Sequence, residues 1–108
     1  MARVVAIVAD LMLASRVTTA LDASGHEVEQ TSTLPTELDG VDLVVADLHA
    51  VEPERLGELG VPVLGFYQHT DEEIKRRADA AGLEIAVPRS RMVRELPELV
   101  ERALGRAA

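Results

Sequence analysis

The sequence predicts an α/β fold, in which one domain contains a parallel five-stranded sheet with helices on both faces. Short apolar runs at 4–9, 41–47 and 61–66 are typical of strands that are buried on both faces. Amphipathic segments alternate with the strand segments, so the β-α pattern repeats five times. Right-handed crossovers then place helices on both faces of the sheet, which makes the fold doubly wound. The chain has 108 residues, enough for a single domain over 1–108 and too few for two.

The first strand and helix are predicted from the run 4–9, which ends at Asp10, and from the segment that follows it. Apolar residues in 13–21 recur at i, i+4, i+7 and i+8, which is one face of a helix. Gly25 is a natural end for that helix.

Residues 26–29 alternate between polar and apolar, which predicts a short edge strand with one wet face and places His26 on the surface. Residues 31–40 leave room for one helical turn at most. The run 41–47 is rich in β-branched residues and predicts a buried central strand that ends at Asp47. In open α/β sheets, ligands bind at the carboxyl ends of such strands.

The second half of the chain repeats the pattern. A short helix is predicted at 53–59, followed by a strand at 61–66. Thr70 and Glu73 have the spacing of a capping box, so the next helix is predicted to begin there. Gly82 ends that helix.

The fifth strand is predicted at 83–87, and the segment 92–104 has apolar residues at helical spacing. Pro97 lies inside that segment, and proline disrupts the interior of a regular helix. We therefore predict a turn first, with the main helix beginning near Pro97 and ending at Gly105.

Charge and composition exclude several function classes. With 19 acidic and 11 basic residues the formal charge is −8, which disfavours binding to nucleic acid or to an anionic membrane. Phe66 and Tyr67 are the only aromatic residues, so no stacking platform for bases exists. The absence of cysteine excludes disulfides, thiol nucleophiles and zinc–thiolate sites. Neither a signal peptide nor an apolar run of roughly 18–20 residues is present, so we expect a cytoplasmic protein.

Several motifs are similar to those of one known family. They are Leu-Val-Val-Ala-Asp at 43–47, Val-Pro-Val-Leu at 61–64, Asp-Glu-Glu at 71–73, Ala-Gly at 81–82 and Arg-Glu-Leu at 94–96. Together they resemble the receiver domain of bacterial two-component response regulators, a flavodoxin-like module, and the likeness covers essentially the whole chain. The resemblance implies a three-layer sandwich with strand order 2-1-3-4-5, which puts the strand ending at Asp47 in the middle of the sheet.

The resemblance also implies aspartyl phosphorylation, in which a carboxylate attacks a phosphoryl donor while Mg²⁺ offsets charge. By position, Asp47 matches the phosphoacceptor and Asp10 matches one metal-binding carboxylate, so Mg²⁺ would be held by Asp10 and Asp47. Receivers place a small hydroxyl residue after the fourth strand and a lysine after the fifth. Tyr67 and Arg89 stand at those positions in this chain.

These departures make the chain similar to a degenerate receiver, or pseudo-receiver. Ala9 and Leu11 stand where further acidic residues would be expected, and a Mg²⁺ site usually needs carboxylates to displace bound water. The bulky phenol of Tyr67 cannot swing in as a small hydroxyl does, and Arg89 replaces the lysine. We therefore expect no enzymatic activity beyond, at most, autophosphorylation at Asp47.

Three functions are compatible with this pattern. The first is a stand-alone pseudo-receiver, monomeric or homodimeric, that binds another protein and has weak or no aspartyl phosphorylation. The second is a functional phosphoacceptor that uses Asp47 and Mg²⁺. The third is a small-anion or metal site formed by Asp10, Asp47 and Arg89, together with His49 and His69 in the loops that line the same crevice.

The surface for a protein partner is inferred from the resemblance and consists of the fourth helix, the fifth strand and the last helix. Ile85, Met92 and Val93 are the candidates for exposed apolar side chains there. Arg89 either clamps a carboxylate or phosphate or forms an internal ion pair with one of the two aspartates. Arg16 is expected to lie too far along the first helix to reach the crevice.

Overall fold

The computed structural model describes residues 1–105 and shows one five-stranded parallel sheet in the order β2-β1-β3-β4-β5. The predicted domain, 1–108, thus includes three residues that lie outside the described range. The strands are β1 (Arg3–Ile7), β2 (Glu27–Thr31), β3 (Leu43–Asp47), β4 (Val63–Tyr67) and β5 (Ile85–Pro88). The helices are α1 (Leu11–Ala23), α2 (Pro53–Leu56), α3 (Glu72–Ala80) and α4 (Arg89–Ala103).

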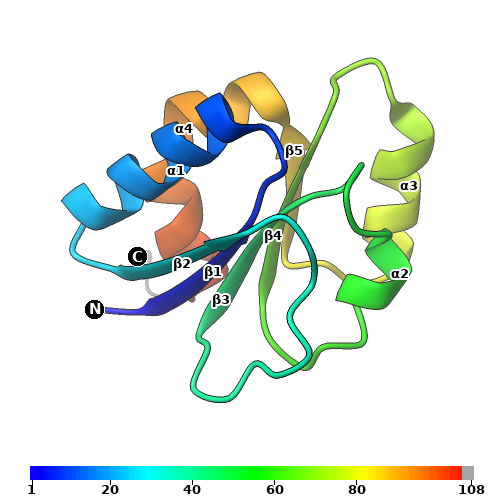
Figure 1. The fold of residues 1–108 in the computed structure, drawn as a ribbon. Coiled ribbons are helices and arrows are strands. Elements are labelled where there is room, and N and C mark those ends of the chain that lie inside the picture. The colour runs from blue at the N-terminus through cyan, green and yellow to red at the C-terminus, as the bar shows by residue number, and fades with distance from the viewer. Residues whose placement is uncertain (106–108) are drawn as a thin grey trace.

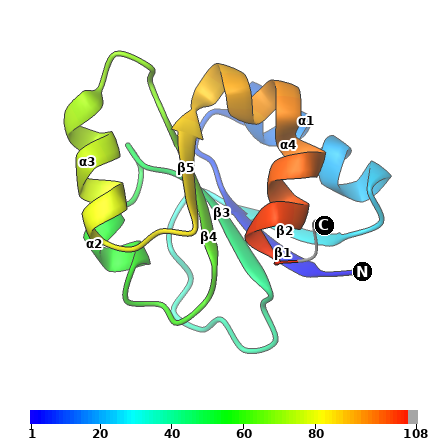
Figure 2. The ribbon, with the colours of Figure 1, turned by 180° about the vertical axis from the view of Figure 1, so that it is seen from behind.

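The helices form two outer layers around the sheet. Helices α1 and α4 cover one face, and α2 and α3 cover the other (Figure 1). The view from behind shows the same three layers, with β3 and β4 between them (Figure 2). The predicted doubly wound sheet with strand order 2-1-3-4-5 is confirmed.

Each face of the sheet is buried in its own apolar core. Alternate residues of a strand point to opposite faces, so Val4 and Ala6 lie in the core beneath α1 and α4. Val5 and Ile7 lie in the core beneath α2 and α3. All four side chains are at most 3% exposed. This two-sided burial explains why the strands are continuous apolar runs.

The edge strand β2 and the segment after it differ from the rest of the fold. Glu29 pairs in register with Val5 of β1, and both Glu27 and Glu29 are exposed. This corner of the sheet therefore lacks an apolar strand surface for a helix to cover. Residues 32–42 accordingly contain no helix, and their partly buried Leu34, Leu38 and Val41 pack on the core instead.

The prediction for the last helix is confirmed for the break near Pro97 and wrong for the residues before it. Helix α4 begins at Arg89, directly after β5, and its backbone leaves helical geometry at Glu95 (φ −119°, ψ 21°). Pro97 lacks an N–H group and its ring crowds the preceding turn. The chain accommodates the proline with a kink at Glu95, two residues earlier, and residues 89–94 before the kink are helical.

The predicted start of α3 is also shifted. Asp71, rather than Thr70, is the N-cap residue, because its carboxylate accepts the Ile74 backbone N–H at 3.0 Å. Asp and Thr can both cap a helix, and the sequence offers them side by side. Within residues 1–105, no helix is long and apolar enough to span a bilayer.

Two predictions of exposure are wrong. His26 is buried, at 6% exposure: its Nδ1 accepts the Ala2 backbone N–H at 3.1 Å, and its Nε2 lies 3.7 Å from the Glu101 carboxylate. Met92 is fully buried, because it lies on the side of α4 that faces the sheet. Val93 and Ile85 are half-buried.

Candidate functional site

Three chain segments that are distant in sequence meet at the carboxyl edge of the sheet. Asp10 follows β1, Asp47 ends β3 and Arg89 follows β5. The Arg89 Nη2 lies 3.2 Å from the Asp10 Oδ2, and Arg89 borders a small pocket of about 70 Å³ together with Asp47. The structure therefore brings the two aspartates and the guanidinium to one rim, as expected from their places at strand ends.

Both oxygens of the Asp10 carboxylate are engaged. Oδ1 accepts the backbone N–H groups of Met12 (3.0 Å) and Leu13 (3.1 Å), which makes Asp10 the N-cap of α1. Oδ2 accepts a hydrogen bond from Arg89. The Leu13 N–H first, and the Arg89 guanidinium second, hold the pKa of Asp10 below its ordinary value. Asp10 is thus an ionised carboxylate whose negative charge is paired with the guanidinium of Arg89.

Asp47 is held by the loop that follows β3. It is half-buried, and its Oδ1 accepts the His49 backbone N–H at 2.9 Å. The His49 ring in turn connects two loops, because its Nε2 accepts the Gln68 backbone N–H at 3.2 Å. His49, Tyr67 and Gln68 also border the small pocket beside Asp47. The loops after β3 and β4 are therefore linked above this pocket.

The aromatic side chain of Tyr67 is fixed in the core. Tyr67 is 7% exposed and belongs to the apolar core beneath α2 and α3, although it also borders the pocket beside Asp47. A small hydroxyl side chain at a strand end can rotate toward a ligand. The packed ring of Tyr67 lacks that freedom.

Gly65 in β4 leaves room for the side chain of Leu48, the residue that follows Asp47. A Cβ atom at Gly65 in β4 would lie 2.8 Å from the Leu48 Cδ2, closer than carbon atoms approach one another. The absence of a side chain at Gly65 lets Leu48 pack across β4 at 2% exposure. The Leu48 N–H also donates to the Phe66 carbonyl at 3.0 Å, so the chain is anchored immediately after Asp47.

The donor set at this rim does not suit Mg²⁺. Both Asp10 oxygens are occupied by N–H donors, and the neighbouring Ala9 and Leu11 have no ligand atoms in their side chains. In the described part of the chain, no three His, Asp or Glu side chains are grouped so that they could hold a metal ion. Mg²⁺ binds through carboxylates in near-ideal octahedral geometry, which this arrangement does not offer.

The second histidine of the expected crevice lies elsewhere. His69 borders a separate hollow of about 460 Å³ with Arg16, Arg89, Ser90 and Val93, on the side of α1 and α4. His49 and His69 therefore do not line one pocket, and Arg89 borders both. Arg16 does not border the pocket beside Asp47, as expected, but it reaches this neighbouring hollow, which sequence reasoning missed.

Comparison with known proteins supports one fold assignment. No family model and no curated protein sequence matches the chain, whereas many solved structures do. A response regulator receiver domain protein from Clostridium thermocellum superposes with a TM-score of 0.83 at 15% identity, over 98% of this chain and 96% of that one. The fold is that of a receiver domain.

Two other receiver structures agree. The non-phosphorylated HemR receiver domain from Leptospira biflexa has a TM-score of 0.82 at 19% identity and covers 100% of this chain and 98% of its own. A CheY-like receiver domain protein from Methanospirillum hungatei JF-1 has a TM-score of 0.83 at 18% identity, over 97% and 94% of the two chains. The receiver fold therefore extends along essentially the whole chain.

Proposed function

We propose that this receiver-fold chain is a pseudo-receiver, a cytoplasmic signalling module that acts by binding another protein and has weak or no phosphorylation at Asp47. The proposal rests above all on the contact between Arg89 and Asp10. These residues stand at the positions where the resemblance places a phosphoryl-contacting lysine and a metal-binding carboxylate.

The contact opposes phosphorylation for electrostatic reasons. Transfer of a phosphoryl group to a carboxylate requires a positive charge close to the negatively charged phosphoryl oxygens, and a divalent cation supplies it in most such reactions. The guanidinium of Arg89 offsets the negative charge of Asp10 through this ion pair. A second cation at this carboxylate would be repelled by Arg89 and would have to displace two backbone N–H donors from Asp10.

The surroundings of Asp47 support the same conclusion. The Leu48 side chain packs against Gly65, and the His49 ring joins the two loops that border the pocket. Phosphorylation acts as a switch only where charge at the acceptor moves an element with two arrangements. Here the ring of Tyr67 is packed in the core, so we propose that the rim keeps one arrangement and that α4 is part of the surface that binds the partner.

The test is incubation with acetyl phosphate and Mg²⁺, followed by the intact mass of the protein. A phosphorylatable receiver treated in parallel verifies the reagents, and Asp47→Asn controls for labelling elsewhere. We expect the treatment to leave the mass of the wild-type chain unchanged, and likewise that of the Asp47→Asn chain. The addition of one phosphoryl group to most wild-type molecules, absent from Asp47→Asn, would establish a functional phosphoacceptor instead.

A further inference from the structure

Strand β2 forms one edge of the sheet and has backbone groups that point away from its neighbour. Among residues 1–105, β1 is the only strand beside it, and the Glu27 N–H donates to the Ala2 carbonyl at 2.9 Å. In a strand, the backbone groups of successive residues point alternately to its two sides. The N–H and C=O groups of Val28 and Gln30 therefore lie along the free edge, which is a template for pairing with another strand.

Most features that block a free edge are missing from β2. Its five residues pair with β1 in continuous register, and they include neither proline nor lysine. Bulges, prolines and lysines are the usual ways in which an edge is closed to other strands. The opposite edge, β5, is shorter and ends at Pro88, which lacks an N–H group. The charged residues of β2 are two glutamates, so its edge is closed to some strands and open to others.

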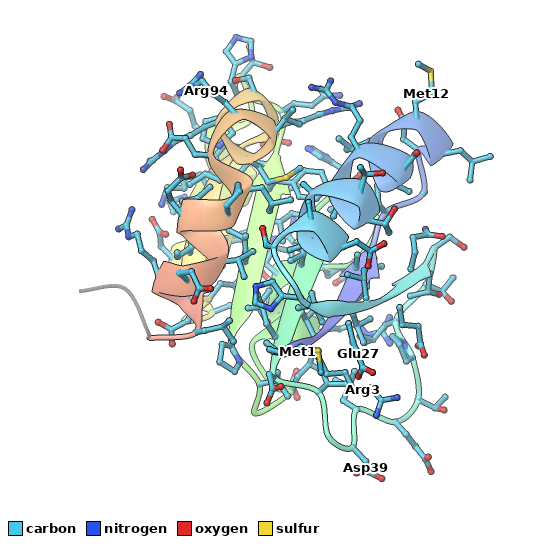
Figure 3. All side chains as sticks on the ribbon, turned by 90° about the vertical axis from the view of Figure 1, so that its left-hand side faces the viewer. Met1, Arg3, Met12, Glu27, Asp39 and Arg94 are labelled. Atoms are coloured by element: carbon cyan, nitrogen blue, oxygen red, sulfur yellow. The ribbon has the colours of Figure 1, made fainter. Side chains whose placement is uncertain are left out.

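The free edge lies in the acidic part of the chain. Residues 17–54 contain nine Asp or Glu and no Lys or Arg. The other residues contain ten acidic and eleven basic side chains, so the negative charge of the chain is confined to this stretch. Figure 3 looks onto the edge, with Glu27 on β2 and Asp39 in the loop below it. A strand that approaches here meets a negative potential.

Unpaired carboxylates lie on both sides of the edge. Val28 packs on the core beneath α1 and α4, so Glu27 and Glu29 point to the other side of the sheet. A hollow of about 540 Å³ beside the strand is lined by Arg3, Asp22, His26, Glu27, Val28 and Glu29. Within residues 1–105, the ion pairs include none of its three carboxylates. One guanidinium thus faces three carboxylates that have no cation of their own.

We propose that the free edge of β2 binds an extended basic segment of another protein, which adds a sixth strand to the sheet. The backbone of this segment pairs with Val28 and Gln30, and its Lys or Arg side chains lie beside Asp22, Glu27 and Glu29. The inference goes beyond the proposed function, because it adds an interaction surface at the sheet edge opposite β5. It does not depend on the chemistry of Asp47.

Charge and shape favour this occupant over others. A second copy that paired antiparallel about Val28 would place its Glu29 opposite Glu27, and like charges in that position destabilise a pair of strands. Nucleic acid, a polyanion, would be repelled by the acidic stretch. A metal ion would leave the backbone groups of the edge unpaired. A basic strand satisfies both the backbone groups and the carboxylates.

The test uses an acetylated and amidated peptide of about nine residues that alternates lysine with threonine, a residue that favours strands. A matched peptide has glutamates in place of the lysines. Titration of the ¹⁵N-labelled full chain is followed by NMR, and we expect the lysine peptide to bind at least about tenfold more tightly than the glutamate peptide at low salt. Bound lysine peptide should slow hydrogen exchange of the Val28 and Gln30 amides at least about tenfold.

Two variants of one residue test the backbone pairing. Gln30→Pro removes an N–H that points to the free edge and leaves the bonds to β1 in place. Gln30→Ala keeps that N–H and loses the same side-chain bond to the Val8 carbonyl. We expect Gln30→Pro to weaken binding of the lysine peptide at least about tenfold, because the proline ring also blocks the approach of a strand. Gln30→Ala should bind as the wild type does.

Two variants with the same charge change test the carboxylates. Glu29→Lys should weaken the lysine peptide and favour the glutamate peptide. Glu58→Lys, at an exposed position after α2, should leave the preference for the lysine peptide unchanged. This pair keeps the proposal testable if Gln30→Pro does not fold.

Several results would overturn the proposal. They are equal binding of the two peptides, equal effects of the two Gln30 variants, a preference that Glu29→Lys does not alter, and no saturable shift up to about 1 mM peptide. Protection of the Val28 and Gln30 amides without peptide, rising with protein concentration, would show that a second copy occupies the edge and would also overturn it.

Discussion

Replacing Gly65 with alanine tests how the chain after Asp47 is held. Gly65 does not have a positive φ, so an alanine would fit the backbone and would by itself stabilise a strand by about 0.4–1 kcal/mol. Its Cβ, however, would lie 2.8–3.0 Å from three Leu48 side-chain carbons. Overpacking of this kind costs about 1–3 kcal/mol. We therefore expect Gly65→Ala to lower the free energy of unfolding by about 1–2 kcal/mol.

The second half of the test removes the Leu48 side chain, which is the neighbour of Gly65. Leu48→Ala alone should cost about 2–5 kcal/mol, because Leu48 is 2% exposed and its truncation leaves a cavity. In the Leu48→Ala background, Gly65→Ala meets no clash and fills part of that cavity, so it should be neutral or stabilising. The two substitutions should therefore be coupled by more than about 1 kcal/mol.

Urea denaturation at constant pH measures all four proteins of this cycle, with the slope m as the check that unfolding remains cooperative. If Gly65→Ala costs the same free energy with and without the Leu48 side chain, the added methyl group does not clash with Leu48. Additive costs would mean that Leu48 moves aside easily and does not anchor the loop after Asp47.

Three further predictions concern named contacts. Arg77 on α3 lowers the pKa of Glu54 on α2 from 4.5 to about 2. The stability that this pair contributes is therefore present above pH 4.5 and is lost as the pH falls toward 2. Glu54→Gln should flatten the urea midpoint as a function of pH over this range, and an unchanged profile would contradict the contact. Arg89→Ala should raise the pKa of Asp10 toward its ordinary value without reaching it, because the backbone N–H donors remain; an NMR titration that finds no rise would disprove the contact. His26→Ala should cost about 1–3 kcal/mol in urea, because it leaves a buried backbone N–H without its acceptor, and a neutral substitution would count against that hydrogen bond.

The sheet was predictable because its strands are buried on both faces, and continuous apolar runs report that burial directly. The periodicity of the sequence does not predict the order of the strands, which came from the resemblance to receivers. Strand β4 shows the limit of local patterns. A glycine inside a strand is typical of a bend or a close approach, but only the fold shows that Leu48 is the side chain that approaches Gly65.

The errors at α4 and His26 have related causes. Proline predicts a break, but the position of the break depends on whether Glu95 can leave helical geometry while the first turns stay packed on the sheet. His26 is buried by Ala2 and Glu101, which are 24 and 75 residues away in sequence. No local pattern contains such contacts.

The candidate site was predictable in part. Asp10, Asp47 and Arg89 follow strand ends, and parallel strands bring their carboxyl ends to one edge. The pairing of Arg89 with Asp10 rather than Asp47 was left open by the sequence, because it depends on side-chain geometry. Arg16 was missed because its Cα lies in the second turn of α1, while its long side chain reaches the hollow beside Arg89.

We propose that the guanidinium of Arg89 at this rim takes the place of a divalent cation. Titration of the ¹³C-labelled protein with Mg²⁺, followed at the side-chain carboxyl resonances of Asp10 and Asp47, tests it most directly. We expect no saturable change in either resonance at millimolar Mg²⁺. Saturable changes in both would contradict it and would show that the two carboxylates form a metal site despite Arg89.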